Sequence, residues 1–152
     1  MTTPMNGPLN GIKVLDLTTV FMGPHCTQIL AEYGADVIKL EAPEGDIMRR
    51  IPPARHENMG PLFMLANRGK RSIVLDIKTA AGRAATLKLA AQCDVLVYNL
   101  RPQAMARLGL SYADLTAINP NIIYVGAFGY GQDGPYAAHP AYDDLIQAAA
   151  GL

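Results

Sequence analysis

The sequence of 152 residues has no tryptophan, three phenylalanines and two cysteines, and it carries no excess of charge of either sign. A nucleic-acid-binding module needs a sustained basic surface or stacked aromatic rings, so nucleic acid is not an expected partner. Two cysteines are too few for a disulfide scaffold, and no apolar run reaches the roughly 18 residues of a membrane span. The first residues show no basic segment followed by an apolar one, so no signal peptide is expected there. We therefore expect a soluble, cytoplasmic protein with no membrane partner.

What the sequence does contain is enough apolar material for a core, because half of its residues are hydrophobic and 17% are charged. Short β-rich runs alternate with helical patterns. Strands are predicted at residues 12–17, 36–41, 72–76, 95–98 and 122–127. Helices are predicted at residues 25–33, 80–91, 102–109 and 111–118, whereas residues 42–71 read as irregular. This alternation predicts an α/β fold, a Rossmann-like, mostly parallel sheet with helices on both faces.

Ligands of such sheets bind at the carboxyl ends of the strands. The segment after the first strand, residues 18–24, has one glycine where a dinucleotide fingerprint needs three, and the chain has no Gly-Lys-Ser/Thr phosphate loop. The three histidines lack the spacing of metal ligands, so no metal is expected. Cys26 lies one turn into the first helix and is expected to pack in the interior.

Charge is distributed unevenly along this neutral chain. Residues 49–78 hold seven basic side chains and two acidic ones. This excess suits a small polyanionic ligand, and it equally suits a solvated loop. A ligand with phosphates and a long, less polar arm, such as coenzyme A, would fit apolar loops between Arg and Lys.

Several short blocks, in one order, carry a resemblance to a known family. They are residues 11–18 (GIKVLDLT), Gly23-Pro24, 34–41 (GADVIKLE), 67–73 (NRGKRSI), Leu75-Asp76, Asn99, Arg101-Pro102 and 129–136 (GYGQDGPY). Over residues 8–152 the chain closely resembles the class III coenzyme A transferases of the CaiB/BaiF type. This group includes formyl-CoA and carnitine-CoA transferases and α-methylacyl-CoA racemase.

The resemblance implies that residues 1–152 are the amino-terminal, CoA-binding Rossmann-like domain of a larger fold, without its small domain and its carboxyl-terminal return segment. It implies acyl-CoA and a carboxylic acid as substrates, and a homodimer or other self-association. It also assigns CoA contacts: the arm to Thr19, Val20, Phe21 and Met22, the nucleotide end to Leu75 and Lys78, the adenosine or pantetheine portion to Asn99 and Leu100, and a phosphate to Arg107. Ala42 departs from the pattern, since some relatives carry a basic residue there.

In this family an aspartate carboxylate attacks the acyl-CoA thioester and forms a covalent aspartyl intermediate. The resemblance places that aspartate beyond Leu152, so we expect no catalytic nucleophile here and an inactive isolated chain, with Gln132 and Tyr142 as supporting candidates. Asp143 and Asp144 open a final helical pattern and are expected to cap it. Two alternatives stay open. One is a CoA-binding or assembly module without catalysis; the other is a racemase, disfavoured because Tyr142 stands where a histidine base is expected.

Overall fold

Five parallel strands form a single sheet in the computed structural model, which describes residues 7–152. The strands are β1 (Lys13–Leu17), β2 (Asp36–Glu41), β3 (Arg71–Val74), β4 (Val95–Tyr98) and β5 (Ile123–Gly126), in the order β3-β2-β1-β4-β5. Each neighbouring pair is parallel. The predicted α/β fold, with a doubly wound parallel sheet, is confirmed.

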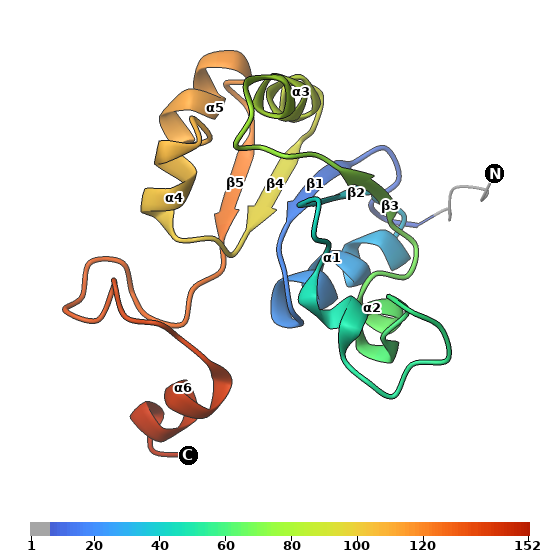
Figure 1. Ribbon diagram of the computed structural model, residues 1–152. Helices are drawn as coiled ribbons and strands as arrows, with labels where there is room; N and C mark the ends of the chain where they lie inside the picture. The colour runs from blue at the N-terminus through green and yellow to red at the C-terminus, as the bar shows by residue number, and fades with distance from the viewer. Residues whose placement is uncertain (1–6) are drawn as a thin grey trace.

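Helices cover both faces of this sheet (Figure 1). On one face lie α1 (Met22–Glu32) and α2 (Pro61–Ala66), with the short 3-10 helix η1 (Ile47–Arg50) beside α2. The other face carries α3 (Ala80–Ala90), α4 (Pro102–Arg107) and α5 (Tyr112–Ile118). The core divides in the same way. A small cluster around Val14, Val37 and Val97 packs under α1, and a larger one around Leu15, Leu96 and Leu115 packs under α3–α5.

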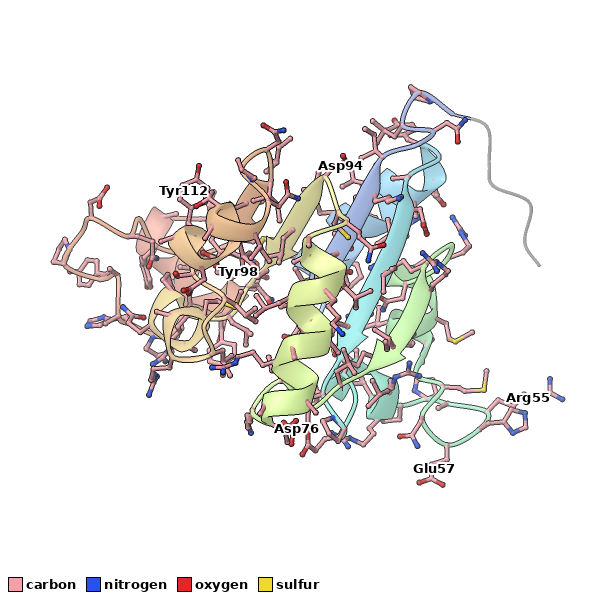
Figure 2. The ribbon with its side chains drawn as sticks, turned by 90° about the horizontal axis from the view of Figure 1, so that it is seen from above. Arg55, Glu57, Asp76, Asp94, Tyr98 and Tyr112 are labelled. Carbon is pink, nitrogen blue, oxygen red and sulfur yellow. The ribbon has the colours of Figure 1, made fainter. Side chains whose placement is uncertain are left out.

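The order of the strands fixes where a ligand can enter. β1 is flanked by β2 on one side and β4 on the other, so the chain changes direction across the sheet between β1 and β4. A crevice opens at such a switch point, at the carboxyl ends of the strands. Figure 2 shows the two ends of the sheet: Asp94 precedes β4 at one end, and Asp76 follows β3 at the other.

The structure corrects several sequence predictions. Residues 42–71 are not irregular throughout, since they contain η1 and α2, which were too short for a helical period to show in the sequence. α1 begins at Met22 rather than near His25, because Pro24 is tolerated in a first helical turn. Cys26 is exposed on that helix, so the prediction that it packs in the interior is wrong.

The last helix, α6 (Asp143–Ala150), stands apart from the sheet at the end of an extended segment (Figure 1). None of its residues is buried. Its N-cap is Tyr142, with no side-chain capping bond, and the Asp143 carboxylate instead accepts a hydrogen bond from Gln147. Asp143 and Asp144 therefore lie in the first turn, as predicted, where their charges face the positive end of the helix, but neither is its N-cap. No helix within residues 7–152 is long and apolar enough to cross a membrane.

Candidate functional site

Two loops meet at the switch point and are joined by one side chain. The Asn99 Oδ1 atom, just after β4, accepts a hydrogen bond from the Thr19 backbone N–H at 3.0 Å. The Asn99 Nδ2 atom donates to the Thr19 carbonyl at 2.9 Å. The amide thereby continues the pairing of β1 with β4 past the ends of the strands. The structure thus brings together two residues that were predicted to lie in one site.

The β1–α1 turn (residues 18–21) presents apolar side chains beside Asn99. Val20 is 47% exposed, Phe21 38% and Met22, at the start of α1, 61%. The Phe21 ring stacks on the His25 ring with their centroids 5.5 Å apart. Gly23 lets α1 lie close to Thr18 of the turn, because a Cβ at Gly23 would lie only 2.5 Å from the Thr18 Cβ atom. These exposed side chains therefore form an apolar surface beside the switch point.

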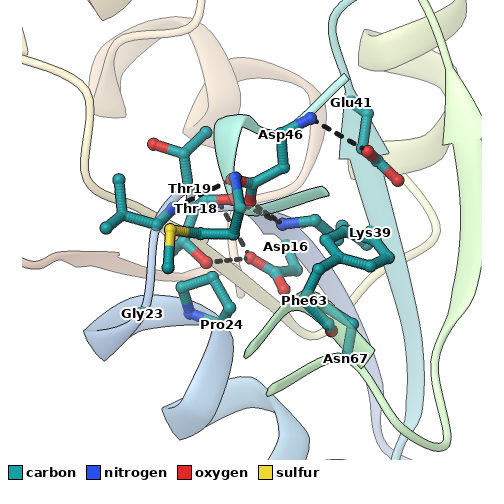
Figure 3. Close-up of polar contacts among 12 residues, drawn as sticks. Asp16, Thr18, Thr19, Gly23, Pro24, Lys39, Glu41, Asp46, Phe63 and Asn67 are labelled. Atoms are coloured by element: carbon teal, nitrogen blue, oxygen red, sulfur yellow. Dashed lines mark hydrogen bonds and ion pairs between the residues drawn. The ribbon is translucent and has the colours of Figure 1, made fainter. Parts of the chain in front are cut away.

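Beneath this turn lies a buried polar network (Figure 3). Lys39 on β2 donates from Nζ to the Thr18 carbonyl at 2.8 Å and pairs with Asp46 at 3.1 Å. Both side chains of that pair are 1% exposed. The Asp46 carboxylate also accepts from the Val20 N–H at 3.3 Å and from the Met48 N–H at 3.0 Å. The network connects the end of β2 to the backbone of the β1–α1 turn.

A second buried pair holds the other side of the turn. Asp16 on β1 accepts hydrogen bonds from Thr18, from Thr27 on α1 and from Lys70, whose Nζ lies 2.9 Å from Asp16 Oδ2. Lys70 also donates to the Pro24 carbonyl at 2.7 Å. Burial lowers the pKa of Lys70, and the Asp16 carboxylate opposes that shift. Lys70 and Asp16 therefore form a buried ion pair, with side chains that are 1% and 0% exposed.

Glu41, the last residue of β2, anchors the segment that follows it. Its carboxylate accepts two hydrogen bonds from Arg49, both of 2.7 Å, and one of 2.8 Å from Ser72. Burial raises the pKa of Glu41, but the bonds from Arg49, Ser72 and the Asp46 backbone outweigh it and lower the pKa to about 2. The Arg49 guanidinium lies over the Phe63 ring, 3.7 Å from its centroid. Glu41 therefore stays charged and fixes η1 against the sheet.

A basic pocket of about 220 Å³ opens where α3 begins. It contains Lys78 and Arg107, two residues far apart in sequence that were predicted to contact phosphate. Arg83 also lines it and was missed by the sequence analysis, although it stands one helical turn after Thr79, the N-cap of α3. Its other lining residues are Ile77, Thr79, Ala80 and Leu108. Three cations beside a helix N-terminus suit a phosphate group.

Of the remaining predicted site residues, Leu100 follows Asn99 at the switch point, whereas the others lie elsewhere. Leu75 and Leu100 are partly buried and pack against the larger apolar cluster. Ala42 is exposed just after β2. Gln132 donates to the Tyr130 carbonyl and Tyr142 is 69% exposed, both on the segment that runs away from the sheet (Figure 1). The structure does not bring these two residues to the switch point.

The basic excess of residues 49–78 is largely neutralised by acids from other segments. Four of its seven cations form ion pairs: Arg49 with Glu41, Arg68 with Glu32, Lys70 with Asp16, and Arg71 with Asp36. Lys78 is different, because it lines the basic pocket. Most of the excess is therefore paired within the fold, which neither interpretation described, and binding of a polyanion by this stretch stays a prediction.

Comparison with known proteins gives one consistent result. The model of the family described as CoA-transferase family III matches residues 9–152. The chain is 45% identical over 154 residues to the acetyl-CoA:oxalate CoA-transferase of Acetobacter aceti, covering 99% of this chain and 39% of that protein. It is 42% identical over 146 residues to the human succinyl-CoA:glutarate CoA-transferase, covering 95% of this chain and 33% of that protein.

Solved structures agree. A CAIB/BAIF family protein from Brucella suis superposes with a TM-score of 0.92 at 42% identity, over 97% of this chain and 40% of that one. The Rv3272 protein of Mycobacterium tuberculosis gives a TM-score of 0.90 at 38% identity, over 96% of this chain and 41% of that one. The chain therefore spans between about a third and two fifths of the length of these relatives.

Proposed function

The chain belongs to CoA-transferase family III, and we propose that it is the CoA-binding domain of an enzyme that moves coenzyme A between an acyl-CoA and a carboxylic acid. The family supports CoA as substrate or product, and the relatives named above are oxalate and glutarate CoA-transferases. The proposal for this chain concerns which of its residues bind CoA and what they contribute to the transfer.

The observation that carries this proposal is the convergence of Lys78, Arg83 and Arg107 in one pocket. CoA has a 3′-phosphate and a diphosphate, and none of the seven residues lining this pocket is acidic. Converging cations favour a phosphorylated ligand, because charge-assisted hydrogen bonds to phosphate are about twice as strong as neutral ones. We assign the nucleotide end of CoA to this pocket.

The path of the rest of the ligand follows α4. This helix starts two residues after Leu100, at the switch point, and ends at Arg107, in the pocket. Six helical residues span about 9 Å, a length that the pantetheine arm can cover. At the other end the exposed Val20 and Phe21 side chains offer an apolar contact to that arm. The thioester would then reach the crevice between β1 and β4.

For the chemistry we propose an aspartyl intermediate. A carboxylate attacks the thioester carbonyl, and the CoA thiolate leaves as a mixed anhydride forms. The thiolate then attacks the aspartyl carbonyl of that anhydride, which releases the donor carboxylate and leaves an aspartyl-CoA thioester. The acceptor carboxylate displaces the thiolate from this thioester and forms a second anhydride. The thiolate attacks the acceptor carbonyl of that anhydride, which releases the new acyl-CoA and restores the aspartate. The acids at the switch point are committed elsewhere, since Asp16 and Asp46 are buried against Lys70 and Lys39. The family resemblance places the nucleophile beyond Leu152, and on that ground we expect no CoA transfer by this chain alone.

Calorimetric titration of the chain with CoA tests the binding site. Replacing Lys78 or Arg107 by alanine should weaken binding about tenfold each, the effect of one lost charge-assisted hydrogen bond. Lys88→Ala is the matched control, because it removes the same charge from an exposed position later on α3. Equal Kd values for all variants, or no binding by the unsubstituted chain, would refute this assignment.

A transfer assay tests the chemistry separately. An acyl-CoA donor and oxalate are incubated with the chain, and the new CoA thioester is measured. We expect none to form, and sustained turnover would show that the nucleophile lies among the residues we have excluded.

A further inference from the structure

The backbone of the β1–α1 turn is strained at Val20. Its φ is +71°, in the left-handed region that a β-branched side chain rarely adopts. Burial does not account for this conformation, because the Val20 side chain is 47% exposed. A residue held in such a region persists only where surrounding contacts fix it, and such residues cluster at ligand sites.

Side-chain contacts fix three successive residues of this turn. Lys39 donates to the Thr18 carbonyl at 2.8 Å. Asn99 pairs with both backbone groups of Thr19. Asp46 accepts from the Val20 N–H at 3.3 Å. Two of these three anchors, Lys39 and Asp46, form an ion pair with each other.

Stability alone does not explain that ion pair. Both side chains are 1% exposed, and taking two charges out of water costs about as much as their attraction returns. An apolar pair of similar volume would fill the same space. What an apolar pair cannot do is donate to the Thr18 carbonyl and accept from the Val20 N–H. The charged groups here hold the conformation of the turn and, through the Met48 N–H, the start of η1.

We infer that Lys39 and Asp46 are positioning residues, which hold the β1–α1 turn in its left-handed conformation so that it is preformed for the arm of CoA. This inference rests on the proposed function. It adds a role for two residues whose side chains are 1% exposed and to which we assign no contact with CoA. Without the pair, the preference of Val20 for φ below zero pulls the turn away from its bound shape, and part of the binding free energy is spent on restoring it.

The test is a rescue experiment with CoA titration. The double variant Lys39→Met/Asp46→Leu removes both anchors while keeping the site filled, and we expect its Kd for CoA to rise about tenfold. Adding Val20→Gly to that double variant should recover most of the loss, because glycine adopts positive φ at no steric cost. Adding Val20→Ala is the matched control. It removes the side chain beyond Cβ, but its Cβ atom still disfavours positive φ, so it should not rescue.

A ligand-free measurement accompanies the titration. Amide hydrogen exchange at Val20 should speed up at least tenfold in the double variant, while the amides of β1 keep their protection. The inference is overturned if the double variant binds CoA as the unsubstituted chain does, or if glycine rescues no better than alanine. Absence of CoA binding by the unsubstituted chain is a distinct result, which overturns the proposed function and this inference with it.

Discussion

The two faces of the sheet differ in polarity at the carboxyl ends of the same strands. On the face under α1 and α2, β1 and β2 bury Asp16, Lys39 and Glu41 at their carboxyl ends. On the face under α3–α5, the same two strands bury Leu17 and Leu40. Successive side chains of a strand point to opposite faces, so five or six residues are enough to make one face polar and the other apolar.

The polar face is polar only where the candidate site lies. Nearer the amino ends of the strands it carries Val14 and Val37, which pack under α1. The charges begin with Asp16 and Lys39, and both bond to groups of the β1–α1 turn. The comparison teaches that the apolar face supplies stability, whereas the buried charges hold the loops that shape the site.

The largest expected effect comes from breaking a buried ion pair on the polar face. Asp16→Ala leaves the Lys70 ammonium, 1% exposed, without its partner. We expect the free energy of unfolding to fall by about 4 kcal/mol, because an uncompensated buried charge is left behind. Urea unfolding measures this. Asp16→Ala/Lys70→Met should recover much of the loss, and a double variant no more stable than the single one would contradict the ion-pair explanation.

A cavity on the apolar face should cost somewhat less. Leu96 is fully buried among residues of β1, α4 and α5. Leu96→Ala should lower the free energy of unfolding by about 3 kcal/mol through lost burial and a cavity. The loss should be the same at pH 5 and pH 8, since no titrating group is involved. A loss that changes with pH would show that the two faces are coupled.

Acid should weaken the polar face selectively. The pKa of Glu41 is about 2 in the folded chain, against an ordinary 4.5. Its contribution is therefore fully present above about pH 4.5 and is lost as the pH falls towards 2. Between pH 5 and pH 2, the unsubstituted chain should lose about 2 kcal/mol more stability than Glu41→Gln does. Parallel stability curves for the two proteins would contradict the Arg49–Glu41 account.

The smallest effect is expected at the surface. Arg71 and Asp36 pair through two hydrogen bonds, but their side chains are 63% and 46% exposed. Asp36→Ala should change the free energy of unfolding by less than about 1 kcal/mol, because solvent screens exposed pairs. A larger loss in urea unfolding would mean that solvent exposure does not determine how much an ion pair of this chain contributes to stability.

The sequence was sufficient for the sheet but not for the network beneath the turn. Val95–Tyr98 and its neighbours are β-rich runs bounded by turn residues, and that local pattern located all five strands. α2 was missed because six residues show no helical period. Lys39 reads as an ordinary polar residue of a strand. Its burial depends on Asp46, seven residues later, and on a fold that returns that carboxylate to the end of β2.

The candidate site was predictable to a similar degree. The family resemblance pointed to Lys78 and Arg107, and the structure places both in one pocket. The family resemblance gave no indication of Arg83, because nothing in the sequence shows that α3 and the end of α4 meet at this pocket. The positive φ of Val20 was equally hidden, since valine is a residue that disfavours it.

A crystal structure of the chain with bound CoA tests the central claim most directly. The account predicts phosphate oxygens within hydrogen-bonding distance of Lys78 and Arg107, and a pantetheine arm that passes Asn99 and Val20 towards the crevice between β1 and β4. CoA bound elsewhere on the molecule, or a ligand that leaves this pocket empty at saturating concentration, would contradict it.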